Sequence, residues 1–231
     1  MRSARYYRGA RTAHLERLHH AVPGDFLYMK SMYDFDLSQA PGGQVVRQVG
    51  LRHIIRALWK GTYGILEIVE PYAPSALPQN LAIALTQRIA RILRRPETQL
   101  VTYAIENADL VEKFSSQFHL PAGVVRAVLR LTVGSCYSSL ARIAFGTQAA
   151  EQTYRALLGE RRWRKSRPQR TVIPGLSSPR PDAELRVPES RRVIFLGAFD
   201  ERKGLRELIA AWPLVTRALP DAELLVVGKG P

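Results

Sequence analysis

Short apolar runs alternate with longer amphipathic runs along most of the chain. The short runs, at residues 25–32, 63–69, 100–105 and 142–145, are typical of buried strands. The longer runs have apolar residues at helical spacing, and we expect helices at residues 12–21, 44–59, 78–95, 120–140 and 149–158. Strands that alternate with helices predict βαβ units around a parallel sheet, so we expect an α/β, Rossmann-like fold.

Residues 78–95 form the clearest helical pattern in the first half of the chain. At about 100° per residue, its leucines and isoleucines share one arc and its arginines fall on the other side. The apolar set is Leu81, Leu85, Ile89, Ile92 and Leu93, and the basic set is Arg88, Arg91, Arg94 and Arg95. We expect the arginines to face solvent, with a membrane-facing or interdomain patch as the alternative.

The pattern changes after residue 176. Residues 177–190 are rich in proline and poor in apolar side chains, which is typical of a linker. Residues 191–231 then form a new unit, with a strand at 192–196, a helix at 205–219 and a strand at 223–227.

These boundaries predict one domain at residues 1–176 and an incomplete second domain at residues 191–231. A single βαβ unit cannot cover both faces of its sheet, so we expect the chain to be a fragment. No strand pattern precedes the first expected helix, so we expect the front end to be cut as well.

The chain is strongly basic, with 34 Lys and Arg against 20 Asp and Glu and a formal net charge of +14. This excess permits a polyanionic partner without requiring one. The basic run at residues 161–165, followed by Arg167 and Arg170, predicts a solvated turn. Contact with nucleic acid or an anionic lipid is the alternative for this run.

Several classes of site and protein are excluded by simple counts. Cys136 is the only cysteine, so neither an intramolecular disulfide framework nor a multi-cysteine metal site is possible. The five histidines lack metal-ligand spacing, and we expect no metal site. No run of about 18 apolar residues could span a membrane, so we expect a cytoplasmic protein.

A series of short motifs runs through the chain in order. The first half carries EPYAPS at residues 70–75, AFGT at 144–147 and TVIPG at 171–175. The second unit carries Gly197, Lys203-Gly204, Pro220-Asp221 and Gly228-Lys229-Gly230-Pro231. The series resembles the GT-B glycosyltransferases of the large retaining family 4 (group 1). In this comparison the second unit is similar to the opening of the family's donor-binding domain.

The resemblance implies transfer of a hexosyl group from a nucleotide-diphosphate sugar to a glycan, lipid or small-molecule acceptor. It implies a retaining, metal-independent reaction with no cofactor beyond the donor substrate. The implied partners are the nucleotide sugar and a carbohydrate or lipid-linked acceptor, with peripheral contact at the inner face of an anionic membrane and no nucleic acid. The family's Glu-x7-Glu pattern is expected beyond Gly230, so we expect the chain alone to be inactive.

The donor-side residues follow from the resemblance and fit the chemistry of a diphosphate. Gly197 and Gly204 would let the backbone approach the phosphates, and the helix that begins at Leu205 favours an anion at its N-terminus. Lys203 supplies a positive charge for the leaving group. The family usually has Arg where this chain has Ala198, and Arg202 is a candidate substitute.

The candidates in the first domain are two acceptor-side carboxylates and a donor-side glycine pair. Glu106 stands where many relatives have a histidine near the reacting sugar, and it is a candidate polar clamp or base for an acceptor hydroxyl. Glu70 is a candidate for the same role, and a solvated carboxylate at a strand end is the alternative for both. Gly42 and Gly43 resemble the family's glycine loop near the donor, with an ordinary turn as the alternative.

Two other classes of function remain open. A basic module that binds nucleic acid or a membrane surface through a degenerate transferase fold would explain the charge. An NAD-dependent Rossmann enzyme is a third hypothesis, although no Gly-x-Gly-x-x-Gly follows an early strand.

Overall fold

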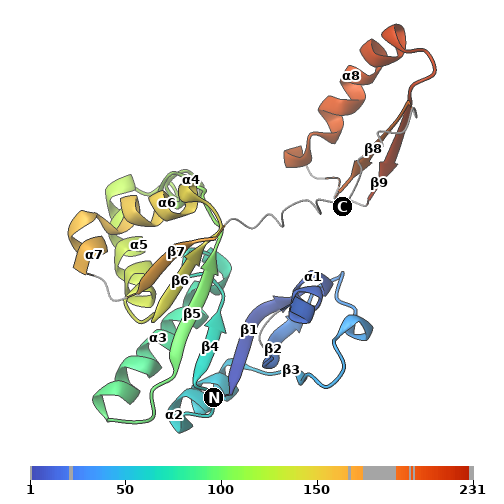
Figure 1. Ribbon diagram of the computed structural model, residues 1–231. Helices are drawn as coiled ribbons and strands as arrows, with labels where there is room; N and C mark the ends of the chain where they lie inside the picture. The colour runs from blue at the N-terminus through green and yellow to red at the C-terminus, as the bar shows by residue number, and fades with distance from the viewer. Residues whose placement is uncertain are drawn as a thin grey trace. The chain divides into compact units, whose positions relative to one another are not determined.

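The computed structural model describes residues 2–20, 23–165, 168–173, 191–197, 199 and 201–228, with the side chains of residues 19, 20 and 202 left out. The chain divides into two compact units, residues 1–176 and 177–231 (Figure 1). The expected linker at 177–190 lies outside the described residues. None of the helices in the described part of the chain combines the length and apolarity needed to cross a bilayer.

Among the described residues, the first unit is built on a seven-stranded parallel sheet in the order β3-β2-β1-β4-β5-β6-β7. The strands are β1 (Ser3–Ala10), β2 (Asp25–Ser31), β3 (Val46–Gln48), β4 (Ile65–Ile68), β5 (Gln99–Ala104), β6 (Arg142–Phe145) and β7 (Gln169–Val172). The expected α/β, Rossmann-like fold is confirmed.

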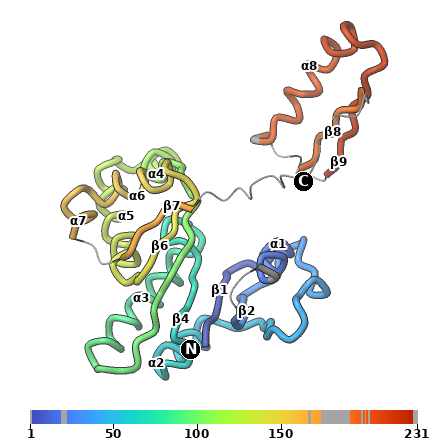
Figure 2. The backbone as a smooth tube through the Cα atoms, in the orientation of Figure 1, coloured from blue at the N-terminus to red at the C-terminus, as the bar shows by residue number. Residues whose placement is uncertain are grey.

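Helices cover both faces of this sheet to different extents. They are α1 (Thr12–Glu16), α2 (Leu51–Lys60), α3 (Leu77–Ile92), α4 (Leu110–Phe118), α5 (Ala122–Tyr137), α6 (Gln148–Leu158) and α7 (Glu160–Lys165). Helices α2, α3, α5 and α6 pack side by side in that order and share the main core with the sheet (Figure 2). Helix α1 packs on a smaller core with Phe26, Tyr7 and Tyr28.

Strand β1 overturns the expectation that no strand precedes the first helix. It pairs with β2 on one side and β4 on the other, so it is central in the sheet. Its alternation is hard to recognise because both sides of the strand carry bulky polar residues. Tyr6 enters the main core, while Arg5 and Tyr7 face the other way and contact Glu67 of β4.

Other boundaries differ from the expected ones. The helix expected at 12–21 is α1 followed by a 3-10 helix at Arg17–His20, and the stretch 44–59 divides into β3 and α2 at Gly50. The helix expected at 120–140 is α5, which begins after Pro121, a residue whose ring suits the start of a helix rather than its interior; α4 is a separate helix before it. The basic run at 161–165 forms α7 rather than a turn, because Trp163 is buried in the main core.

Helix α3 buries a different face from the one its apolar arc suggests. Ile83, Ala84 and Ala90 face the sheet together with the polar Asn80 and Gln87. The apolar arc at Leu85, Ile89, Ile92 and Leu93 is exposed. Arg88 does not face solvent freely; it donates to the Ser139 hydroxyl and the Ser135 carbonyl at the end of α5.

The second unit consists of β8 (Arg192–Leu196), a 3-10 helix at Glu201–Lys203, α8 (Leu205–Ala218) and β9 (Glu223–Val227). Strands β8 and β9 pair in parallel, so the expected βαβ unit is confirmed. Leu205, Leu208, Trp212 and Val215 of α8 are half-buried, and none of the described residues in this unit is fully buried.

Candidate functional site

The carboxyl ends of the strands in the first unit lie along one edge of the sheet, because all the strands are parallel. The chain leaves β1 toward β2 on one side, and β4 lies on the other side of β1. Ligands of open α/β sheets bind at such a reversal of strand order, outside the carboxyl ends. Glu70 follows β4 and Glu106 follows β5, so both candidate carboxylates belong to this edge.

Glu70 is held by several parts of the fold. Its carboxylate accepts hydrogen bonds from the backbone N–H groups of Ile105 and Glu106, at 3.2 Å each. The Asn80 side chain of α3 donates to the carbonyl oxygens of Val69 and Glu70, at 2.9 and 3.3 Å. The Glu70 side chain is therefore fixed between the loops that follow β4 and β5.

The environment of Glu70 suits a group that exchanges a proton near neutral pH. Burial raises its pKa from the usual 4.5 to about 7, against the opposing effect of the two N–H donors. The negative charge of Glu106 raises the pKa further. A carboxyl group poised near 7 inside a cleft is a candidate general acid or base.

A cavity of about 270 Å³ lies beside Glu70 at the ends of β1, β4 and β5. An adjoining hollow of about 380 Å³ shares Tyr7, His14, Arg17, Glu67 and Tyr103 with it. The cavity lining contains Tyr7, Arg8, Gly9, His14, Arg17, Glu67, Ile68, Val69, Glu70, Ser75, Ala76, Tyr103 and Ile105. It therefore offers a titratable carboxyl group, two arginines and aromatic surface to a ligand.

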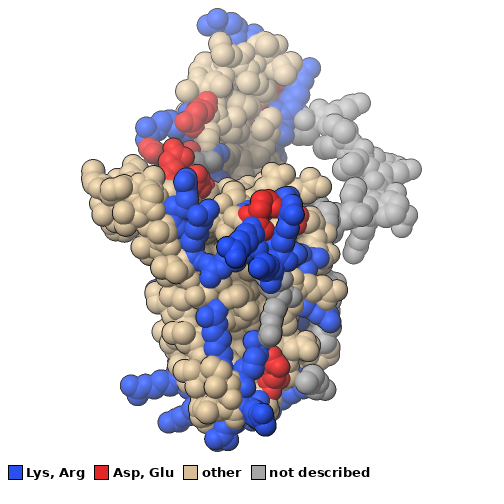
Figure 3. All heavy atoms as spheres, turned by 90° about the vertical axis from the view of Figure 1, so that its left-hand side faces the viewer, with Lys and Arg blue, Asp and Glu red and all other residues tan. Residues whose placement is uncertain are grey.

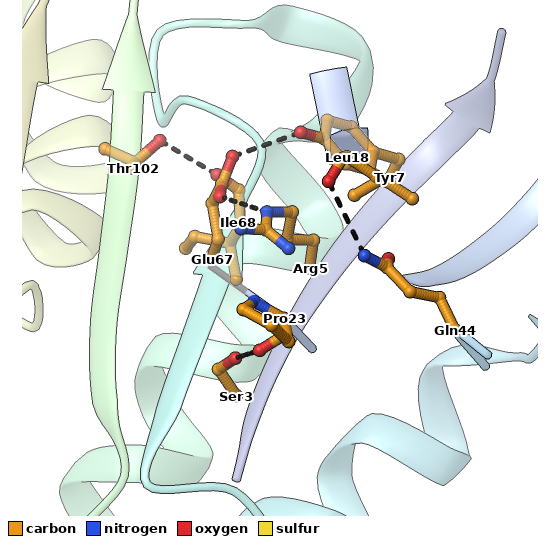
Figure 4. Close-up of polar contacts among 9 residues, drawn as sticks. All are labelled: Ser3, Arg5, Tyr7, Leu18, Pro23, Gln44, Glu67, Ile68 and Thr102. Atoms are coloured by element: carbon orange, nitrogen blue, oxygen red, sulfur yellow. Dashed lines mark hydrogen bonds and ion pairs between the residues drawn. The ribbon is translucent and has the colours of Figure 1, made fainter. Parts of the chain in front are cut away.

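A polar and aromatic cluster lines this cavity and the adjoining hollow. Figure 4 shows Arg5 and Tyr7 of β1 reaching toward Glu67 of β4. The Tyr7 hydroxyl donates to the Glu67 carboxylate at 3.1 Å, and the Arg5 guanidinium lies 3.2 Å from it. The Tyr7 ring stacks on His14 with 4.3 Å between centroids.

The titration of this cluster follows from burial. Burial and the negative charge of Glu67 raise the pKa of Tyr7, so its hydroxyl stays protonated and remains a donor. Burial and the nearby Arg17 and Arg11 lower the pKa of His14, which keeps its ring neutral at neutral pH. The sequence patterns did not indicate these residues, because strand β1 was not recognised. With β1 placed in the sheet, the tendency of ligands to bind where the strand order reverses would have indicated them.

The other candidates of the first unit are not among the residues that line this cavity. Glu106 supplies its N–H to Glu70, but its own carboxylate accepts the N–H of Ala108 at 3.1 Å, and it is not among the lining residues. Gly42 and Gly43 lie in the connection from β2 to β3, near the edge of the sheet. Gly43 has φ +80°, so this turn needs a glycine, but neither glycine lines the cavity beside Glu70.

A second cavity of about 270 Å³ lies among α4, α5 and α6, lined in part by Tyr72, Asn107, Asp109, Arg126 and Arg130. The carboxylate of Asp109 in this lining already accepts hydrogen bonds from the N–H groups of Val111 and Glu112, and so caps the start of α4. The cavity beside Glu70 has the carboxyl group whose pKa is raised, and we take it as the candidate site.

The donor-side glycines of the second unit lie at the carboxyl ends of β8 and β9. The Gly197 N–H donates to the Val227 carbonyl, and a Cβ placed on Gly228 would lie 1.8 Å from the Gly197 carbonyl oxygen. Gly204 adopts φ +71° at the N-terminus of α8, directly after the exposed Lys203. The Arg202 side chain, Ala198 and residues 229–231 lie outside the described residues, as do Pro174 and Gly175.

The described residues were also searched for a metal-binding cluster of side chains. No group of three His, Cys, Asp or Glu side chains there is arranged to hold a metal ion.

The sequence is similar to two curated proteins, although no family model matches it. It is 51% identical over 43 residues, 18% of this chain and 11% of the relative, to a phosphatidyl-myo-inositol mannosyltransferase of Mycolicibacterium smegmatis. It is 25% identical over 173 residues, 74% of this chain and 38% of the relative, to a protein of the same name from Propionibacterium freudenreichii. The matches thus span less than half of either relative, and over most of its length this chain is a distant relative of proteins named as mannosyltransferases.

Proposed function

We propose that the protein functions in glycosyl transfer, moving a hexosyl group from a nucleotide-diphosphate sugar to a lipid-linked acceptor. The observation that carries this proposal is the buried Glu70 carboxyl group, with a pKa of about 7, in a cavity at the strand reversal of a Rossmann-like sheet. The names of the two distant relatives support a mannosyl donor and a phosphatidylinositol acceptor. We further propose GT-B architecture and a retaining, metal-independent reaction of the family 4 type, on the motif series.

In the proposed reaction, an acceptor hydroxyl bonds to the anomeric carbon of the donor sugar on the same face that the diphosphate leaves, so the configuration is retained. The bond from that carbon to the diphosphate oxygen breaks, and the diphosphate leaves with the electron pair. The hydroxyl proton passes to the Glu70 carboxylate, whose pKa of about 7 allows it to accept the proton and release it again. Ile105 and Glu106 hold the carboxylate in position through their N–H groups.

In the second unit we assign the diphosphate to Gly197, Lys203, Gly204 and the N-terminus of α8, with Arg202 beside them. The glycines leave the backbone accessible, and the first N–H groups of α8 and the Lys203 ammonium favour a negative charge.

The observed contacts do not favour the alternative of a nucleic-acid-binding module on the basic run. Within α7, Trp163 is buried under the guanidinium of Arg170, Arg162 donates to the Arg130 carbonyl, and Arg164 pairs with Glu160. Arg162 and Arg170 thus join α7 to its neighbours, and the buried Trp163 is not accessible for stacking on a base.

The pH dependence of acceptor binding tests the role of Glu70. Glycerophosphoinositol, a soluble headgroup of the proposed acceptor, is titrated into the protein by calorimetry on either side of pH 7. An ionised Glu70 accepts a hydrogen bond from the acceptor hydroxyl, so affinity should rise by about fivefold to tenfold as the pH increases through 7. The pKa of His14 lies below its usual 6.5, so its own titration would fall below the rise expected of Glu70.

Glu70→Gln keeps an acceptor oxygen for the two N–H groups but does not titrate, and its affinity should not change across the same range. The exposed Glu112→Gln is the control and should behave as the wild type. A wild-type affinity that ignores pH, or a pH dependence that persists in Glu70→Gln, would show that Glu70 does not contact the acceptor.

A further inference from the structure

The cavity among α4, α5 and α6 is distinct from the one beside Glu70. Its lining comes from the loops after β4 and β5 and from the three helices, and the two cavities have no lining residue in common. Its volume of about 270 Å³ lies at the small end of the range of about 300–1,000 Å³ that is usual for ligand sites. The cavity therefore suits a small molecule rather than a polymer.

Two arginines of α5 line this cavity. Arg126 and Arg130 are four residues apart, so their side chains lie on the same side of the helix, where like charges repel. The Arg130 Nε donates to the Leu157 carbonyl at 2.6 Å, which leaves its two terminal nitrogens for other acceptors. In the described part of the chain, no hydrogen bond or ion pair engages the Arg126 guanidinium. A bound anion would accept from both groups and reduce their repulsion.

The acidic residues near this cavity do not pair with its arginines. Asp109 caps α4, while Glu112 and Glu151, in the first turns of α4 and α6, are not among the lining residues. None of the ion pairs between described residues joins one of these acids to Arg126 or Arg130. The two guanidinium groups therefore remain available to a ligand.

More positive charge lies next to the cavity. A hollow of about 500 Å³ shares Arg130 with it, and this hollow is lined by Arg130, Leu158, Gly159, Glu160, Arg161, Arg162 and Lys165. The acid of this hollow, Glu160, already pairs with Arg155 and Arg164. Figure 3 views the molecule from the side at the left in Figure 1, where α7 lies, and shows Lys and Arg side chains gathered there with fewer Asp and Glu. Such an excess of cations attracts anionic ligands.

The rest of the lining offers partners for hydroxyl groups. Asp109 accepts the two N–H groups of α4 through Oδ1, so Oδ2 can accept from a ligand. The Thr153 hydroxyl donates to the Ala149 carbonyl at 2.9 Å and can still accept a hydrogen bond. Asn107 is exposed and adds an amide that can both donate and accept. The lining thus combines cations with groups that recognise a polyol.

We propose that this cavity binds a small soluble phosphorylated polyol of the sugar-phosphate class. Its phosphate lies against Arg126 and Arg130, and its hydroxyls lie against Asn107, Asp109 and Thr153. The ligand is an effector rather than a substrate, because the Glu70 carboxyl group lines the other cavity. It contacts the loops after β4 and β5, which also position Glu70. The proposal goes beyond the proposed function and does not depend on it.

Isothermal titration of the full chain tests the site with three probes: glucose 6-phosphate, inorganic phosphate and glucose. Glucose 6-phosphate should bind, inorganic phosphate should bind more weakly because it lacks the hydroxyls of the sugar, and glucose should not bind because it lacks the phosphate. Arg126→Gln should weaken the binding of glucose 6-phosphate about tenfold or more, since a charge-assisted hydrogen bond is lost.

Matched variants separate this proposal from a folding defect and from the proposed function. Ala156→Phe, at an exposed lining position of α6, fills cavity space with every charge intact and should also weaken binding. Arg56→Gln, at an exposed position of α2 outside the lining, should bind as the wild type. Glu70→Gln should also bind glucose 6-phosphate normally, so a failure of the catalytic proposal leaves this test unaffected. Circular dichroism should show that the Arg126, Ala156 and Arg56 variants remain folded, because all three positions are exposed.

Three results would overturn the proposal. The first is a wild type that does not bind glucose 6-phosphate. The second is an affinity for glucose 6-phosphate that is unchanged in Arg126→Gln or in Ala156→Phe, which would place the bound ligand elsewhere. The third is inorganic phosphate that binds as tightly as glucose 6-phosphate, which would show that the lining does not recognise a polyol.

Discussion

The Glu70 side chain is buried, is held in place by hydrogen bonds, and has a raised pKa. Two N–H groups from the loop after β5 hold its carboxylate, and Asn80 holds its backbone. The sequence could predict that Glu70 and Glu106 share an edge of the sheet, since both follow strands. It could not predict which one would be buried, because the choice depends on α3 and α6 closing over the loop after β4, where Tyr154 accepts the N–H of Tyr72.

The raised pKa of Glu70 predicts a specific dependence of stability on pH. The folded protein binds this proton more tightly than the unfolded chain, so the free energy of unfolding should decrease as pH rises from 4.5 to about 7. The shift corresponds to about 3 kcal/mol across this window. In Glu70→Gln this contribution should vanish, and urea unfolding at a series of pH values measures the difference.

A difference between wild type and Glu70→Gln that stays constant from pH 4.5 to above 7 would mean that Glu70 has an ordinary pKa in the folded state. Glu112→Gln, on the exposed surface of α4, should track the wild type throughout.

At the scale of elements, the sequence predicted the strands that are continuous apolar runs. It did not predict the elements in which apolar and polar residues are mixed. Strand β6 occupies the residues expected from its pattern, 142–145. Strand β1 was missed because its Arg5 and Tyr7 find partners on Glu67, which only the fold brings near. The orientation of α3 was also unpredictable, because hydrogen bonds to loop carbonyls, rather than apolar burial, decide which face points inward.

This account of α3 predicts that substitutions will have effects opposite to those its apolar arc suggests. Asn80→Leu adds a hydrophobic residue to a buried position but leaves the carbonyls of Val69 and Glu70 without their donor. It should lower the free energy of unfolding by about 2 kcal/mol. Leu85→Asn, on the exposed arc, should change it by less than about 0.5 kcal/mol. Urea unfolding of the two variants measures these changes. If Asn80→Leu were stabilised and Leu85→Asn strongly destabilised, the apolar arc of α3 would have to pack inward.

At the scale of the whole molecule, we propose acceptor-side chemistry for the first unit and a diphosphate-binding turn for the second. The motif series in the sequence indicated both, and the βαβ arrangement of the second unit agrees with it. The net charge of +14 indicates little about function, because several of the arginines stabilise the fold. Arg88, Arg130 and Arg162 all donate to backbone carbonyls, and a count of charges cannot show which arginines are used in this way.

We propose above all that the protein binds a nucleotide-diphosphate sugar through Lys203 and the N-terminus of α8. Isothermal titration with guanosine- and uridine-diphosphate sugars, and with NAD, tests it most directly, comparing the wild type with Lys203→Met and the exposed control Lys113→Met. We predict that at least one diphosphate sugar binds, that Lys203→Met weakens it about tenfold or more through loss of a charge-assisted hydrogen bond, and that Lys113→Met leaves it unchanged. Binding of NAD alone, or no binding of any diphosphate sugar, would contradict the claim, as would an affinity unchanged in Lys203→Met.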